Sequence, residues 1–171
     1  MLPSLSDLPG GVALDRDGFT DSDAIGSYET EFEPEGLVFE LGSSHVIGIS
    51  TSVELQETEL EAQGPVLFIR AAGPQLFGEL AGASFAKVAG FTPENIVFEG
   101  LDVPQVGDAV AGLSMKIDTA VIDLEAYMLF FSRGRVIATV MVMGPAGKIA
   151  LEDVADLAQL VNERIVQFSP P

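Results

Sequence analysis

The stretch LEAYMLFFSRGRVIATVMVM, residues 124–143, holds two runs of apolar and β-branched residues around Ser132-Arg133-Gly134-Arg135. Each run has the length of a β-strand, and a short Gly-containing connection between two such runs is typical of a hairpin. Neither run approaches the ~20 apolar residues that a membrane-spanning helix needs. The stretch therefore predicts two strands, Leu124–Phe131 and Val136–Met143, joined by a tight turn.

The segment after this hairpin predicts a helix. Its apolar residues recur at spacings of three and four, the period of one helical face: Leu151, Val154, Ala158, Val161, Ile165 and Phe168. Glu152 and Asp153 lie in the first turn, where the helix dipole favours anions. Pro170-Pro171 would end the helix.

The chain before the hairpin predicts further strands and a second helical region. The strands are expected at Val12–Leu14, Tyr28–Glu33, Leu37–Leu41, Val46–Leu55, Asn95–Leu101 and Ala109–Ile117. Thr58–Gly90, rich in Ala, Leu and Phe, predicts a helical region interrupted near Gly73-Pro74. Runs of strands with two well-separated helices are typical of the α+β class. We expect one domain over residues 1–171, with 1–11 as an extended lead-in. Its core would be an antiparallel sheet of six to seven strands with helices packed on it.

The charge of the chain disfavours some partners. The sequence has 26 acidic and 8 basic residues, a net charge of −18, and residues 1–61 hold 14 acidic residues against Arg16 alone. Nucleic acids and anionic membranes repel such a surface, because binding to them depends on Lys and Arg. Solubility and adaptation to salt are the simpler explanations of this charge. Cysteine is absent, which excludes disulfides and zinc–thiolate sites.

The residues needed for common catalytic mechanisms are scarce. His45 is the only histidine, and it is predicted to lie in a hairpin turn beside Ser43 and Ser44. Neighbouring residues seldom form a catalytic triad, and no Gly-x-Ser-x-Gly elbow is present. No glycine pattern matches a phosphate-binding loop. The sequence therefore favours a noncatalytic protein that needs no cofactor. An enzyme that uses carboxylates alone remains the alternative.

One acidic segment could bind calcium. Asp15, Asp17, Asp21 and Asp23 fall within nine residues around Gly18. Clustered carboxylates on a flexible loop suit the oxygen coordination of calcium, although the spacing does not fit an EF-hand. A solvated acidic loop explains the same residues. The alternative function is therefore a calcium-binding protein or a carboxylate-dependent enzyme that uses the Asp15–Asp23 loop.

Three other features could support binding. Arg133 and Arg135 lie at the predicted hairpin tip, where they could contact an anionic partner or simply solubilise a turn. Phe77, Phe85, Phe91 and Phe98 could line a pocket for a small apolar ligand or belong to the core. An exposed edge strand near Tyr28–Phe32 could pair with a second copy and form a homodimer.

The chain resembles the PsbP-like group, including bacterial envelope relatives such as the LpqN-type lipoproteins. The resemblance rests on Leu8-Pro9-Gly10 before Asp17-Gly18-Phe19, on Val103–Ala109, on Ser132–Ile137 and on the closing helix. It implies an α/β/α sandwich around an antiparallel sheet and a noncatalytic role in binding or assembly. It also implies a secreted or lipid-anchored protein, although the sequence has no lipobox cysteine.

Together these observations predict a noncatalytic binding or assembly module, bacterial and extracytoplasmic or at the cell envelope, and otherwise cytoplasmic. Its partner would be another protein or a small apolar ligand. No transmembrane segment and no nucleic-acid partner are expected. A shallow apolar groove between helix and sheet would favour binding, whereas a deep, carboxylate-lined cleft would favour an enzyme.

Overall fold

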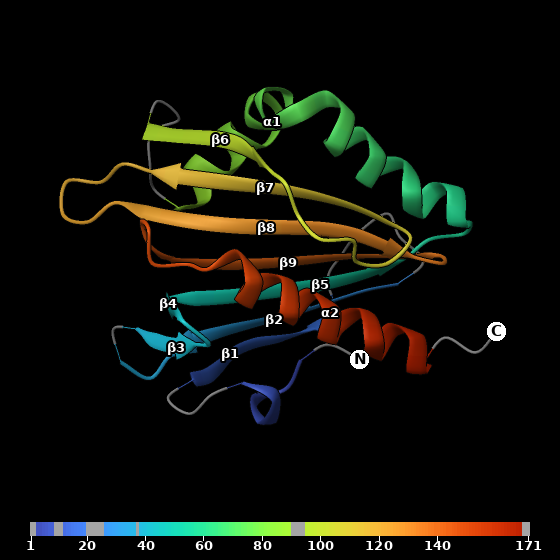
Figure 1. The fold of residues 1–171 in the computed structure, drawn as a ribbon, viewed down its shortest axis with the longest axis horizontal. Helices are drawn as coiled ribbons and strands as arrows, with labels where there is room; N and C mark the ends of the chain where they lie inside the picture. Colours follow the sequence, from blue (N-terminus) through green and yellow to red (C-terminus); the bar gives the residue numbers. More distant parts are fainter. Residues whose placement is uncertain (1–2, 9–11, 20–25, 37, 90–94, 169–171) are drawn as a thin grey trace.

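The computed structural model describes residues 3–8, 12–19, 26–36, 38–89 and 95–168. Its main feature is a seven-stranded antiparallel sheet with strand order β1-β2-β5-β9-β8-β7-β6 (Figure 1). The strands, in that order, are Val12–Phe19, Gly26–Pro34, Gly48–Leu55, Val136–Pro145, Leu124–Arg133, Ala109–Ile117 and Ile96–Leu101. A small hairpin joins β3 (Phe39–Leu41) to β4 (Ser44–Val46). The helices are η1 (Leu5–Asp7), α1 (Glu59–Ala89) and α2 (Leu151–Phe168). The predicted α+β class, with helices packed on an antiparallel sheet, is confirmed.

The hairpin predicted from residues 124–143 occupies the middle of the sheet. β8 and β9 pair with each other from Leu124 opposite Pro145 to Arg133 opposite Val136. β8 also pairs with β7, and β9 also pairs with β5, so both strands are flanked on each side. A strand buried on both faces carries a nearly continuous apolar run, which is why this stretch is so apolar.

Helix α2 covers one face of the sheet. Side chains alternate between the faces of a strand, and one set, which includes Leu129, Phe131 and Val140, packs against Val154 and Val161 of α2. All five are fully buried. The helical period of the sequence therefore identified the buried face of α2 correctly.

Helix α1 covers the opposite face, over β6, β7 and β8 (Figure 1). Leu113, Met115 and Met128 form a second buried cluster, against which α1 and β6 pack. Phe77 of α1 meets Phe98 of β6 edge to face, with ring centroids 5.5 Å apart. These two aromatic residues thus belong to the core, as one of the two interpretations of the sequence held. The side chain of Phe85 and the whole of Phe91 lie outside the described residues.

The predicted interruption of the helical region is confirmed. Gly73 has φ 75° and ψ 175°, so α1 consists of two helical segments that meet at this residue. A side chain would make this left-handed φ unfavourable, whereas glycine adopts it readily. Pro74 begins the second segment, where its missing N–H costs no helical hydrogen bond.

Two expectations about the first strands are wrong. Asp15–Phe19, predicted as part of a loop, continues β1, which pairs with β2 through a bulge at Asp15. Tyr28–Phe32 is therefore not an edge strand, because β2 has β1 on one side and β5 on the other. The pairing with β2 overrides the polar composition of this segment, as tertiary context often does for strands. Among the described strands of this sheet, β1 and β6 form the edges, and self-association through an edge stays a prediction.

A carboxylate ties the β3–β4 hairpin to α2. Asp153 Oδ2 accepts hydrogen bonds from Ser43 N at 2.8 Å, Ser43 Oγ at 3.1 Å and Ser44 Oγ at 2.8 Å. Burial alone would raise the pKa of Asp153, but the hydrogen bonds from Ser44 and Ser43 outweigh it and hold the pKa below the ordinary value of 3.8.

The lowered pKa of Asp153 makes part of the stability dependent on pH. The folded protein binds this proton more weakly than the unfolded chain, so the carboxylate stabilises the fold above pH 3.8. This contribution is lost as the pH falls from 3.8 through the pKa that Asp153 has in the folded protein. We expect Asp153→Asn to lower the free energy of unfolding at pH 7 by about 1 kcal/mol and to weaken the loss of stability below pH 3.8. Urea unfolding at pH 7 and at a pH below 3.8 measures both effects. Asp156→Asn, an exposed position on the same helix, should change neither, and an equal effect there would contradict the assignment.

Candidate ligand-binding site

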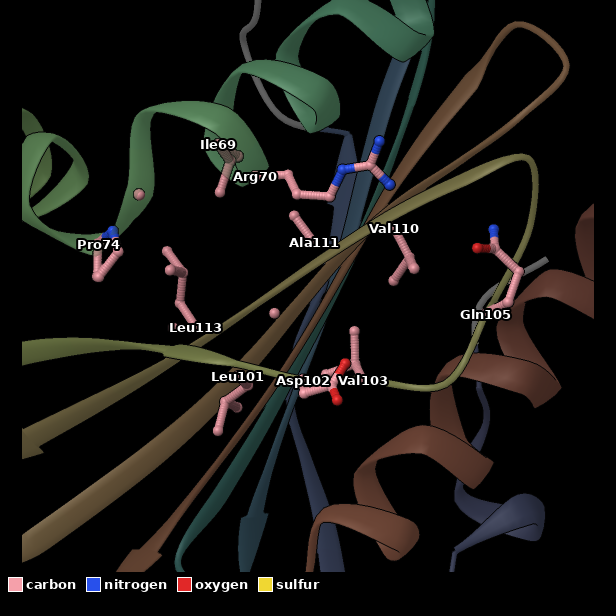
Figure 2. A pocket seen from close by; sticks show the side chains of 13 residues that line it. Ile69, Arg70, Pro74, Leu101, Asp102, Val103, Gln105, Val110, Ala111 and Leu113 are labelled. Atoms are coloured by element: carbon pink, nitrogen blue, oxygen red, sulfur yellow. The ribbon is translucent and has the colours of Figure 1, made fainter.

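A cavity of about 300 Å³ lies between the kink of α1, the end of β6 and the start of β7. Figure 2 shows its lining side chains, with α1 along one side, β7 as the floor and the loop after β6 along the other side. Ile69, Arg70, Gly73 and Pro74 come from α1, and Val110–Leu113 come from β7. The remaining lining residues, Gly100–Val103 and Gln105, belong to β6 and the loop that follows it.

The cavity exists because β6 does not pair with the whole of β7 and stops short of its first residues. Their pairing runs from Ile96 opposite Ile117 to Leu101 opposite Gly112, whereas Ala109–Ala111 pair with β8 only. Beyond Leu101 the chain turns to the other face of the sheet, where Val103 packs against the core under α2. This departure leaves Ala109–Ala111 without a strand partner on that side, although all three residues are buried.

This space stays open because two of the residues beside it are glycines. A Cβ atom on Gly100 would approach no atom closer than Pro74 Cδ, at 3.9 Å. The kink at Gly73 also bends α1 at the point where it passes over Gly100 and β7. Glycines at positions 73 and 100 therefore leave a hollow where a continuous helix and a larger side chain would pack together.

The chemistry of the cavity is mixed. Leu101, Val103 and Leu113 provide apolar walls, and exposed Arg70 and Asp102 provide charges at its rim. Figure 2 places these two charged side chains on different sides, Arg70 on α1 and Asp102 after β6. Neither side chain has a hydrogen bond or an ion pair within the part of the chain that the structure describes. Such a site can bind a small molecule through apolar contacts and orient it through one cation and one anion.

The cavity does not resemble the cleft of a carboxylate-dependent hydrolase. Among the described residues that line it, Asp102 is the only acidic one, and those enzymes hold two carboxyl groups across the bond that they cleave.

The predicted calcium ligands are only partly described. Asp15 is exposed at the bulge of β1, and Asp17 lies in the same strand. Asp21 and Asp23 lie outside the described residues. Within the described ranges, no three His, Asp or Glu side chains gather as metal ligands would. Calcium binding by the four aspartates stays a prediction, on a segment that is strand rather than loop up to Phe19.

The predicted basic tip makes contacts within the chain. Arg133 Nη1 donates to Asp108 Oδ1 at 3.0 Å, and the N–H of Gly134 donates to Asp108 Oδ2 at 2.7 Å. Arg135 is exposed and donates to the carbonyl of Glu57 at 3.4 Å. Arg133 thus forms an ion pair with Asp108. A role of both arginines in partner binding stays a prediction.

His45 is exposed in β4 opposite Glu40.

A second cavity, of about 230 Å³, lies between η1, the β3–β4 turn and α2. Its lining includes Asp7 and Asp153, but both carboxylates already have partners. Asp7 accepts hydrogen bonds from Ser4 and forms an ion pair with Arg164, and Asp153 holds the β3–β4 turn. These contacts connect secondary-structure elements, so we assign this cavity a structural role.

Sequence reasoning missed Arg70 and Asp102. Clustered aspartates and spaced aromatic residues stand out in the sequence, whereas Arg70 and Asp102 lie 32 positions apart without a common motif. The interruption at Gly73-Pro74 was the available signal, because a kink in a helix above a sheet opens space beneath it. The residues across that space depend on where β6 ends, which the sequence does not specify.

The fold defines the chain as an α+β sandwich, with one long helix on each face of an antiparallel sheet. Among solved structures it is similar to the extracellular domain of PknH from Mycobacterium tuberculosis. The match has a TM-score of 0.60 and covers 97% of this chain and 93% of that chain at 9% sequence identity. At this identity the likeness shows the fold alone.

The other comparisons find no relative. No protein-family model matches the sequence, and no curated protein sequence matches it. The resemblance to the PsbP-like and LpqN-type proteins therefore rests on the quoted motifs, and the likeness to a solved structure supports only the kind of fold it implied. In the described chain, neither helix combines the length and the apolar character that crossing a membrane requires.

Proposed function

We propose that this protein is a noncatalytic extracytoplasmic binding domain that holds a small ligand in the cavity beside Gly73. The observation that carries the proposal is the cavity itself, which is walled by Leu101, Val103 and Leu113 and rimmed by Arg70 and Asp102. Its volume of about 300 Å³ is at the lower end of the range that small-molecule sites occupy. A compact ligand fits such a space better than a large cofactor.

The extracytoplasmic location is proposed on the fold. The similar domain of PknH is described as extracellular, and the envelope relatives suggested by the sequence motifs are secreted or lipid-anchored. A cavity with apolar walls and one cation and one anion at its rim suits a role in recognition. The location can be tested with a reporter enzyme that is active only after export. It would be fused to the chain and expressed from the native gene.

Filling the cavity should abolish ligand binding without unfolding the protein. Gly100 lies in β6 and has only Pro74 Cδ near the position of a Cβ, so Gly100→Val places two methyl groups in the cavity. We expect toluene, used as an apolar probe, to shift the backbone amide resonances of Gly73, Gly100 and Gly112 in the wild-type protein. The Gly100→Val variant should show no such saturable shift.

The matched control is Gly26→Val, in β2 and at the other end of the sheet. A Cβ there would meet no atom within 4 Å, so this variant should bind toluene as the wild type does. Thermal unfolding would verify that both variants are folded. Unchanged toluene binding by Gly100→Val, or shifts elsewhere than around the cavity, would contradict the proposed site.

A further inference from the structure

We infer that the ligand of this cavity is a free α-amino acid with an apolar side chain. Its carboxylate would bind Arg70, its ammonium group would bind Asp102, and its side chain would enter the hollow between the two walls. This inference rests on the proposed function and specifies the ligand of the same site. It combines three observations: opposite charges on facing walls, an apolar interior and a covered floor that limits the length of the ligand.

Two charges of opposite sign face each other across the cavity. Arg70 projects from α1 on one wall, and Asp102 follows β6 on the other wall (Figure 2). Neither side chain forms an ion pair or a hydrogen bond within the part of the chain that the structure describes. A simple anion would satisfy Arg70 but would be repelled by Asp102, and a simple cation would meet the reverse conflict. A molecule that carries both charges close together satisfies both walls at once.

The polar groups of the two walls set the orientation of the ligand. The wall after β6 also contains Gln105, whose side-chain nitrogen donates to the carbonyl of Gly107 at 3.1 Å. The side-chain oxygen of Gln105 is a further acceptor on the same wall as Asp102. Both residues suit an ammonium group, which can only donate. On the opposite wall, the guanidinium of Arg70 is a planar fork of donors that matches the geometry of a carboxylate.

The interior of the cavity suits an apolar side chain. Ile69, Leu101 and Leu113 line it, and the space beside Gly100 is filled by no side chain of its own. An aliphatic side chain of the ligand that enters this space is removed from water, which favours binding. A polar side chain would lose its hydrogen bonds to water against the same residues. The interior therefore selects an amino acid of the size and character of leucine or valine.

The floor of the cavity limits the length of the ligand. Ala109, Val110 and Ala111 of β7 are only 5%, 6% and 3% exposed. Ala109 and Ala111 pack with Val66 of α1, and Val110 belongs to the core under α2. Because these residues are covered, β7 cannot accept an added strand there, and the main chain of a peptide would find no partner. A single amino acid needs none, because the two facing walls hold its polar groups.

The test compares L-leucine with three analogues. Isocaproate lacks the amino group of leucine, isoamylamine lacks its carboxylate and glycine lacks its side chain. The backbone amide resonances of Gly73, Gly100 and Gly112 report binding to the wild-type protein. We expect leucine to bind about fivefold more tightly than isocaproate or isoamylamine, the effect of a partly exposed ionic contact. We expect it to bind about tenfold more tightly than glycine, because only leucine buries an aliphatic side chain.

Two variants assign the charges of the ligand to the two walls. Arg70→Ala should weaken the binding of leucine about fivefold and should not weaken that of isoamylamine. Asp102→Asn should weaken the binding of leucine by a similar factor and should not weaken that of isocaproate. Lys148→Ala and Asp156→Asn each remove one exposed charge outside the cavity lining, and they should leave the affinity for leucine unchanged. Circular dichroism would establish that each variant retains the wild-type fold.

The outcomes separate this inference from the proposed function. If toluene binds but leucine binds no more tightly than isocaproate and isoamylamine, the amino acid is wrong and the cavity remains a ligand site. Equal binding of glycine and leucine would overturn the placement of the side chain. Binding of leucine that neither Arg70→Ala nor Asp102→Asn alters would overturn the placement of its charges. If neither toluene nor leucine binds, both the inference and the proposed function fall.

Discussion

Replacing Phe131 by alanine should lower the free energy of unfolding by about 3–5 kcal/mol, the cost of removing a phenyl ring from a well-packed core. Phe131 lies in β8 with none of its surface exposed, in the cluster that also holds Val154 and Val161 of α2. The cavity left by the ring would lie between sheet and helix, where the central strand has little freedom to move inward. Urea unfolding followed by circular dichroism measures the loss.

Phe68→Ala is the matched control, because it makes the same chemical change on α1 at a side chain that is 53% exposed. This variant should lose less than about 1 kcal/mol, since surface substitutions seldom cost more. Similar losses for the two variants would contradict the proposed packing of the sheet against α2. The toluene affinity of Phe68→Ala also shows whether the outer face of α1 contributes to binding.

Replacing Gly107 by alanine is expected to have the second-largest effect, a loss of about 2–5 kcal/mol. Gly107 has φ +64°, a conformation that costs other residues about 1–2 kcal/mol. A Cβ there would also lie 2.2 Å from the carbonyl oxygen of Ser132. Backbone atoms can relieve such a contact only by moving, and overpacking of this kind costs about 1–3 kcal/mol. Thermal or urea unfolding of the purified variant measures the sum.

The Gly134→Ala variant separates the two causes of this loss, which are the positive φ and the contact with Ser132. Gly134 also has a positive φ, +56°, but a Cβ there would meet no atom within 4 Å. This variant should therefore lose only the conformational part, about 1–2 kcal/mol. Equal losses at the two positions would mean that the contact with Ser132 contributes nothing, and that the loop before β7 is free to shift. That result would also weaken the description of the cavity, which this loop partly encloses.

Much of the fold could be predicted from local pattern. The apolar runs on either side of Gly134 predicted the central hairpin, and the spacing of Val154, Val161 and Ile165 predicted the buried face of α2. These predictions succeeded because a strand buried on both faces is apolar throughout, and a helix with one buried face repeats its apolar residues with a period of 3.6. The interruption near Gly73 was predictable for a similar reason, since glycine followed by proline disrupts a helix wherever it occurs.

The sequence could not show which strands pair with one another. Asp15–Phe19 carries too few apolar residues to indicate a strand, yet it extends β1 because Arg16–Phe19 pair with Tyr28–Glu31 of β2. The wrong assignment of this segment also made Tyr28–Phe32 appear to be an edge. Partners distant in sequence decide such cases, and a single strand holds no record of them.

The sequence by itself determined the class of fold, the faces of the main elements and the acidic surface, because each depends on the composition or the period of one segment. Only the tertiary structure decided the candidate site. Arg70, Asp102 and Gly100 come together because α1 bends at Gly73 exactly where β6 parts from β7. That coincidence depends on the register between strands and on the path of a helix above them, and both are set by packing among distant segments.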